Sequence, residues 1–301
     1  MHKISSQNRM GAARQCMDVR TGMHYRDRPA DSETIPDIPL PGTRAMLPDA
    51  SFYALAIPAV LLVGLTKGGM GEALGLMGVP ILAMAVSPVQ AAAIMLPILI
   101  VMDWVSLWLW RHFYDRRTLL LMLPGALIGI ALGWATSAAV PAEVMRLVIG
   151  AVTIWFALRY FYNRFGPLAG VPVEAKGQRP VAATFWSMLA GYGSFVAHAG
   201  GPPFQIYGLP LKLDPRTYTG TSVRFFAVLN FVKLLPYFAL GQLDGTNLAI
   251  SASLLPFAPL ATVAGAWIIR RMKPDVFYPF MYLMALLAAI KLFVDGLGVI
   301  W

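Results

Sequence analysis

The chain has 301 residues, of which 57% are hydrophobic and only 13% are charged. Globular domains carry about 25% charged residues, and a soluble protein of this length cannot bury so much apolar surface. This composition excludes a disordered chain, a disulfide scaffold and a water-soluble enzyme, and it indicates a polytopic membrane protein.

The formal net charge of +9 comes from 24 basic and 15 acidic residues. Its distribution argues against nucleic acid as a partner, because residues 1–47 hold seven basic and five acidic groups without a basic stripe. The single Cys16 excludes a disulfide within the chain, and the four histidines are too scattered for a metal cluster. We therefore expect no cofactor and no metal.

Residues 1–47 are polar and rich in proline, which predicts a disordered tail or sequence upstream of a later start at Met46. A spanning helix needs about 20 mainly apolar residues. Six runs meet this length, at about 89–110, 118–139, 143–162, 216–241, 246–269 and 275–298.

Two further apolar regions are interrupted by glycine and proline. Region 51–87 contains TKGGMGEALG at 66–75, and region 182–211 contains HAGGPP at 198–203. Such backbone is tolerated at membrane depth only where protein buries it or where it lines a wet cavity. The sequence therefore predicts two broken, re-entrant segments in addition to the six spans.

The basic residues of the connections predict the topology. Twelve of them lie at 111–117, 159–179, 211–216 and 270–273, whereas the connections near 136–142 and 242–246 have none. The positive-inside rule places the basic connections in the cytoplasm and the C-terminus outside. The side of the N-terminus stays open.

The two halves of the membrane part share a pattern at an offset of about 130 residues. The matches are Lys67-Gly68-Gly69 with His198-Ala199-Gly200, Gly78 and Pro80 with Gly208 and Pro210, Pro124 with Pro256, and Gly133 with Gly265. They predict a first repeat at 48–165, a cytoplasmic linker at 166–181 and a second repeat at 182–301. Three spans per half make the halves inverted, as in secondary transporters. The alternative is chance matching of glycine and proline.

Lys67 lies in the first break, and a membrane-buried charge calls for a partner or a function. Glycines there free backbone N–H groups at the start of a half-helix, whose positive end suits an anion. The second break offers the same arrangement, and Lys233 lies deep in the span 216–241. The predicted anion site comprises Lys67, Gly68, Gly69, Gly71, His198, Gly200, Gly201, Gln205, Thr221, Ser222 and Lys233. The alternative is that Lys67 only pairs with Glu72 or Asp103.

Other polar groups near the spans have two interpretations each. Glu72 and Asp103 are either counter-charges to Lys67 or proton relays. His198 either couples protons to transport or is a hydrogen-bonded link between helices. The hydroxyls of Thr221 and Ser222, next to Arg224, either reach a substrate or bond the preceding turn. Arg146 and Lys291 are expected to extend to a membrane interface.

An enzymatic function has little support, because the chain has no HExxH, no G-x-S-x-G and no phosphate-loop lysine followed by Ser or Thr. A membrane-embedded enzyme using His198 with Asp103 stays as a less favoured alternative.

Three segments resemble the sulfite exporter TauE/SafE family of membrane permeases: LLVGLTKGGMGEALGLMGVPILA (61–83), SPVQAAAIMLPILIVMD (87–103) and FVAHAGGPPFQIYGLPLKLDPRTYTGTSVRFFAVLNFVKLLPY (195–237). The resemblance covers about 50–298. It implies a multi-pass transporter of the bacterial inner membrane for sulfite, sulfonates or related organosulfur anions. One departure is that Met70, Glu72 and Ala73 stand where the family usually has further glycines.

The sequence thus predicts an all-α integral membrane protein with about eight membrane segments in two inverted repeats. Its expected function is that of a secondary transporter that moves a small anion across the inner membrane by alternating access. Its expected partners are the anion, the lipid bilayer and, through a titratable group, the proton; the oligomeric state is left open. An anion channel of the same architecture is the alternative.

Overall fold

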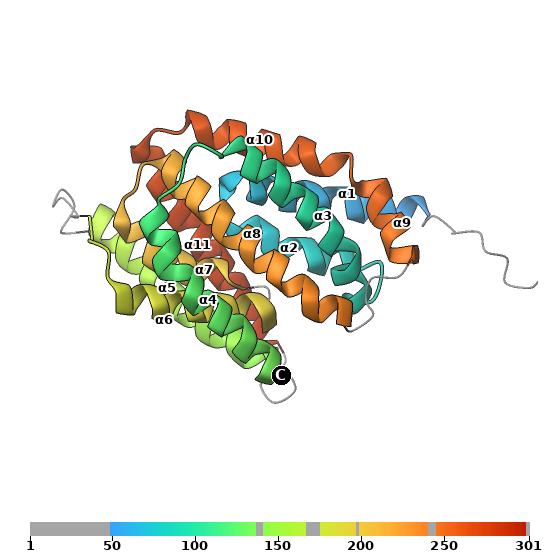
Figure 1. Ribbon diagram of the computed structural model, residues 1–301, viewed down its shortest axis with the longest axis horizontal. Helices are drawn as coiled ribbons and strands as arrows, with labels where there is room; N and C mark the ends of the chain where they lie inside the picture. Colours follow the sequence, from blue (N-terminus) through green and yellow to red (C-terminus); the bar gives the residue numbers. More distant parts are fainter. Residues whose placement is uncertain (1–48, 137–140, 167–174, 197–198, 240–244, 299–301) are drawn as a thin grey trace, which may run out of the picture. The chain divides into compact units, whose positions relative to one another are not determined.

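The computed structural model describes residues 49–136, 141–166, 175–196, 199–239 and 245–298. The predicted tail at 1–47 and His198 lie outside these ranges. Within them every regular element is a helix (Figure 1). The prediction of an all-α integral membrane protein is confirmed.

Five helices in the described ranges are long and apolar enough to cross a membrane. They are α1 with the π-helical turn η1 (Ala50–Leu65 and Thr66–Met70), α3 (Pro88–Leu109), α4 (Arg116–Thr136), α5 (Ala142–Phe165) and α11 (Pro274–Leu297). A sixth span is α9 (Gly245–Leu254) with α10 (Phe257–Arg271), which meet at a bend of 47°. The sequence predicted no bend there; Pro256 lies in it and lacks the N–H that would continue the helix.

The sequence predicts a mainly apolar span at about 216–241. The helix found there, α8 (Pro215–Ala239), is more polar than this prediction. It is long enough to span, but its composition is too polar for it to be among the apolar candidates in the described ranges. It packs against α3, α4, α6 and α10, and its Thr219, Asn230 and Lys233 are buried. Protein rather than lipid therefore surrounds the polar face of α8.

Both interrupted regions are broken in the structure. The chain turns at Gly69 (φ 122°), inside η1, and at Gly71 (φ 88°), directly after it, and α2 (Glu72–Leu82) follows. The first arm, Ala50–Met70, is long enough to span by itself, which the sequence did not predict. In the second region α6 (Pro180–Val196) is followed by α7 (Gly201–Gly208) and the 3₁₀ turn η2 (Leu209–Leu211). Pro202 and Pro203 lie in the first turn of α7. Backbone N–H groups have no partner within the helix there, so the missing N–H of proline loses no hydrogen bond.

Small residues bring helices into close contact. A Cβ on Gly129 of α4 would lie 2.1 Å from the carbonyl oxygen of Met188 on α6, and one on Gly191 would lie 2.0 Å from that of Ala126. Gly125, Gly129 and Gly133 repeat every four residues, which is the small-residue pattern of membrane helix pairs. Gly265 of α10 approaches the backbone of Leu65 on α1 in the same way.

The helices of the two predicted halves pack in matching pairs (Figure 1). Helix α4 packs on α6 as α10 packs on α1, and α2 contacts α11 as α7 contacts α5. Helix α3 contacts α10 as α8 contacts α4, while α5 pairs with α11 and α3 with α8. The helices α1 to α5 thus correspond, in this order, to α6, α7, α8, α9 with α10, and α11. When each helix is replaced by its counterpart, every one of these contacts becomes another contact of the same set.

Candidate functional site

The break after α1 is held by side chains of α3. Broken helical geometry leaves backbone carbonyls without their usual partners, and each must be satisfied when buried. The hydroxyl of Ser106 donates to the carbonyl oxygen of Lys67 (2.7 Å), and the indole N–H of Trp110 donates to that of Gly68 (3.2 Å). Helix α3 therefore fixes the position of Lys67.

The three glycines of the first break have different roles. A Cβ on Gly68 would lie 2.4 Å from the carbonyl oxygen of Thr262, so Gly68 serves close packing of η1 on α10. Gly69 and Gly71 have positive φ, and a Cβ on Gly69 would also lie 2.4 Å from Cγ2 of Thr219. Gly69 and Gly71 line a cavity, whereas Gly68 is not among its lining residues.

Lys67 forms an ion pair with Asp103 of α3, with 2.7 Å between Nζ and Oδ1. The other carboxylate oxygen of Asp103 accepts from Nδ2 of Asn230 on α8, also at 2.7 Å. The side chains of Lys67 and Asp103 are 14% and 8% exposed. Lys67 thus has the counter-charge that one of the two alternatives predicts, while the side chain of Glu72 lies outside the described part of the structure.

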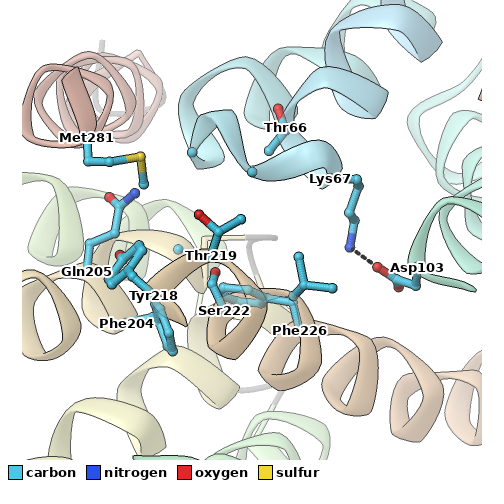
Figure 2. A pocket seen from close by; sticks show the side chains of 14 residues that line it. Thr66, Lys67, Asp103, Phe204, Gln205, Tyr218, Thr219, Ser222, Phe226 and Met281 are labelled. Atoms are coloured by element: carbon cyan, nitrogen blue, oxygen red, sulfur yellow. Dashed lines mark hydrogen bonds and ion pairs between the residues drawn. The ribbon is translucent and has the colours of Figure 1, made fainter. Parts of the chain in front are cut away.

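The cavity beside this ion pair, here called the first cavity, lies between η1, α7, α8 and α11. Its lining residues are Thr66, Lys67, Gly69, Gly71, Asp103, Gly201, Phe204, Gln205, Tyr218, Thr219, Ser222, Val223, Phe226 and Met281. Figure 2 shows Lys67 pointing toward Asp103, with Gln205 and Thr219 across the cavity. The structure therefore brings together seven predicted residues from both halves: Lys67, Gly69, Gly71, Asp103, Gly201, Gln205 and Ser222.

Two polar side chains of the first cavity lack a partner among the described residues. Oε1 of Gln205 and Oγ1 of Thr219 are buried without a hydrogen bond, and each residue is only 2% exposed. A buried polar atom without a partner costs about 1–3 kcal/mol. Such a cost is tolerated where a ligand supplies the missing hydrogen bond.

A second cavity lies on the other side of Lys67. Its polar lining residues are Thr66, Lys67, Arg146, Ser194, Asn230, Lys233 and Asp295, and Gly200 lines it as well. The ammonium group of Lys233 donates to the hydroxyl (3.0 Å) and the carbonyl oxygen (3.3 Å) of Ser194. Lys233 and Gly200, both predicted for the anion site, therefore lie in a different cavity from Gln205.

Three residues line both cavities: Thr66, Lys67 and Phe226. The ring of Phe226 is buried and packs edge-on against Phe204, with 5.4 Å between ring centroids. Thr66, Lys67 and Phe226 therefore lie between the two cavities.

The remaining predicted residues have structural contacts. The hydroxyl of Thr221 donates to the carbonyl oxygen of Thr217 (2.6 Å) and accepts from the backbone N–H of Asp115 (2.8 Å). Thr221 thus bonds the preceding turn, which was the alternative to substrate contact. Arg224 donates to the carbonyl oxygens of Trp110 and Phe113. Lys291 pairs with Asp295 one turn further along α11, at 2.5 Å.

Sequence reasoning missed Thr219, Phe226 and Asn230. All three lie on the face of α8 that carries Ser222 and Lys233, at spacings of three or four residues. Helical periodicity drawn from Ser222 would have found them.

The family model of the sulfite exporter TauE/SafE matches residues 56–292. The chain belongs to this family. The match includes every residue of the first cavity and all of the second except Asp295. Neither the curated proteins nor the solved structures contain a significant match.

Membership of the TauE/SafE family, together with the apolar helices, makes the protein a multi-pass membrane protein of a transporter family. In this TauE/SafE protein both Gly-rich breaks contribute to the first cavity, Gly69 and Gly71 from the first and Gly201 from the second.

Proposed function

We propose that the protein is a secondary transporter that carries a small oxyanion, such as sulfite, a sulfonate or a related organosulfur compound, across the bacterial inner membrane. The observation that carries this proposal is the first cavity. It combines the ammonium group of Lys67 with the buried, unpartnered hydroxyl of Thr219, and both groups can donate a hydrogen bond. A ligand with several oxygens can accept from both, whereas the amide oxygen of Gln205 can itself only accept.

The helix ends around the first cavity favour an anion. Gly71 is the residue before the first turn of α2, and Gly201 is the first residue of α7. Both line the cavity, so the positive ends of two helix dipoles lie at its wall. Lys67 adds a full positive charge. The carboxylate of Asp103 neutralises this charge when no anion is bound.

The paired packing of the two halves supports alternating access. Two halves with an inverted relation can rock against each other around a fixed site, and the exchange of helix pairs is what that relation requires. Tyr218, which lines the first cavity, follows shortly in the sequence after the basic connection 211–216, and this connection is predicted to be cytoplasmic. Arg146 and Asp295 of the second cavity lie near connections predicted to be outside. The protein would thus expose Lys67 to each side in turn.

A continuous anion channel is the less favoured function, since Lys67, Thr66 and Phe226 lie between the two cavities. A transporter that is coupled to an ion gradient accumulates its substrate against a concentration gradient, whereas a channel only lets the anion run down its own electrochemical gradient. Flux into proteoliposomes with an imposed ion gradient distinguishes the two. Substrate recovered chemically unchanged would also count against an enzyme that uses Asp103 with His198.

The experiment that tests the site is flux of sulfite, sulfate, thiosulfate and methanesulfonate through purified protein in liposomes. Lys67→Met alone leaves a buried carboxylate without its cation, so the double variant Lys67→Met/Asp103→Leu is the better test of the site. We expect the double variant to remain folded and to lose at least about tenfold in flux, since an electrostatic contact of about 1.4 kcal/mol already corresponds to that factor. Lys273→Met, at an exposed position, is the matched control. Wild-type flux in the double variant would overturn the assignment.

A further inference from the structure

Among the described residues Lys67 has one acceptor, Asp103, and it lines the cavity in which the proposed anion would be a second. Its ammonium group contacts the carboxylate of Asp103, and both side chains line the first cavity. An anion that enters this cavity therefore competes with Asp103 for the same lysine. This step rests on the proposed function, since it assumes that the cavity receives an anion.

Competition leaves Asp103 in an unfavourable state. The residue is 6% exposed, and among the described residues its carboxylate accepts from the ammonium group of Lys67 and from the amide of Asn230. A carboxylate that loses its cation at a buried position is strongly destabilised and takes up a proton instead. The amide of Asn230 donates to Oδ2, so Oδ1, the oxygen that Lys67 releases, is free to carry the proton.

We propose that Asp103 is the proton-binding residue of this transporter, and that one proton binds to Asp103 for each anion that binds to Lys67. In the empty site the positive charge of the Lys67 ammonium group and the negative charge of the Asp103 carboxylate cancel. In the loaded site the ammonium group is balanced by the anion and Asp103 is neutral, so the site keeps the same charge. A monovalent anion is then carried electroneutrally with its proton, and a divalent anion carries one net negative charge.

Two side chains contact the carboxylate of Asp103 from other elements. Lys67 faces it from η1 and Asn230 from α8. On its own helix Ser106 is engaged with the carbonyl of Lys67. From α10, Arg270 lies over the ring of Trp110, near the end of α3.

Of the first and second cavities, only the second is lined by further charged groups, whereas Asp103 lines only the first. These groups are Arg146, Lys233 and Asp295. We therefore expect the proton to reach Asp103 from the first cavity.

The first test uses the wild-type protein in weakly buffered liposomes with methanesulfonate as the probe. This anion of a strong acid stays fully ionised near neutral pH, so it carries no proton of its own. We expect one proton to enter per anion, reported by a pH-sensitive dye, and no effect of membrane voltage on the flux. Methanesulfonate flux without proton entry would overturn the inference but leave the proposed function intact. Absence of any methanesulfonate flux would overturn the proposed function for sulfonates and this inference with it.

The second test is Asp103→Asn, which keeps the shape of the side chain but cannot take up the proton. We expect flux that is voltage-dependent, with one negative charge per anion, and that loses its dependence on pH. The matched control is Asp275→Asn, at an exposed position in the first turn of α11, which should keep electroneutral, pH-dependent flux. Electroneutral, pH-dependent flux in Asp103→Asn would overturn the role of Asp103. If this variant does not fold, the proton count in the wild type decides.

Discussion

Ser106 and Lys67 are joined by a hydrogen bond of 2.7 Å from the serine hydroxyl to the lysine carbonyl oxygen. Three residues earlier on the same helix, Asp103 accepts from the side chain of Lys67. Helix α3 therefore holds both the backbone and the ammonium group of one lysine. This double contact explains how a lysine in a broken helix keeps a defined position.

The first prediction concerns Ser106→Ala. The serine is fully buried, so the substitution leaves the carbonyl of Lys67 without its donor at a cost of about 1–3 kcal/mol. We expect the thermal unfolding midpoint in detergent to fall by several degrees. Thr184→Ala is the control, because its hydroxyl donates to Pro180 at an exposed position. Equal midpoints for the two variants would contradict a supporting role for Ser106.

Gly69→Ala is expected to impair both folding and flux. The residue has φ 122°, which strains any side chain, and the new Cβ would lie 2.4 Å from Cγ2 of Thr219. Strain of this kind costs about 1–3 kcal/mol, and the clash displaces a residue of the first cavity. Gly177→Ala, with nothing within 4 Å of its Cβ, should behave as wild type. Expression, unfolding midpoint and flux of the two variants test this prediction, and normal flux in Gly69→Ala would show that the break tolerates a side chain.

Thr219→Val and Gln205→Met separate stability from transport. Each substitution removes a buried oxygen that has no partner among the described residues, so stability should stay equal or rise by up to about 1–3 kcal/mol. If the Thr219 hydroxyl or the Gln205 amide group binds the substrate, flux falls at least about tenfold. Thr153→Val is the control, because it removes a hydroxyl that donates to Ile149 outside both cavities, and it should lower stability but spare flux. Unchanged flux in both cavity variants would show that these two side chains do not contact the anion.

Phe226→Leu tests the separation of the two cavities. The ring lies between them, and a smaller side chain opens a path past Lys67. We expect a several-fold higher leak of anion down its own concentration gradient when no proton gradient is imposed, with protein levels near wild type. Phe231→Leu, on the same helix but 71% exposed, is the control. A leak equal to that of the control would place the barrier at other residues.

Much of the architecture follows from local composition. Apolar runs predict most spans because lipid excludes charge along a whole segment, and the glycines predict the breaks because positive φ is open to them. The same reasoning found Lys67, Gly71, Gln205 and Ser222 for the first cavity. It did not predict that Ala50–Met70 spans by itself, nor that Lys233 would line another cavity.

The sequence by itself determined the membrane class, the family, the two breaks and the lysine worth testing. Only the tertiary structure decided that Asp103 pairs with Lys67, that Gly68 packs on α10 and that Phe226 separates two cavities. The physical reason is sequence distance. The contacts of Asp103 join residues 36 and 127 positions apart, and no local pattern encodes which distant side chain meets a buried charge.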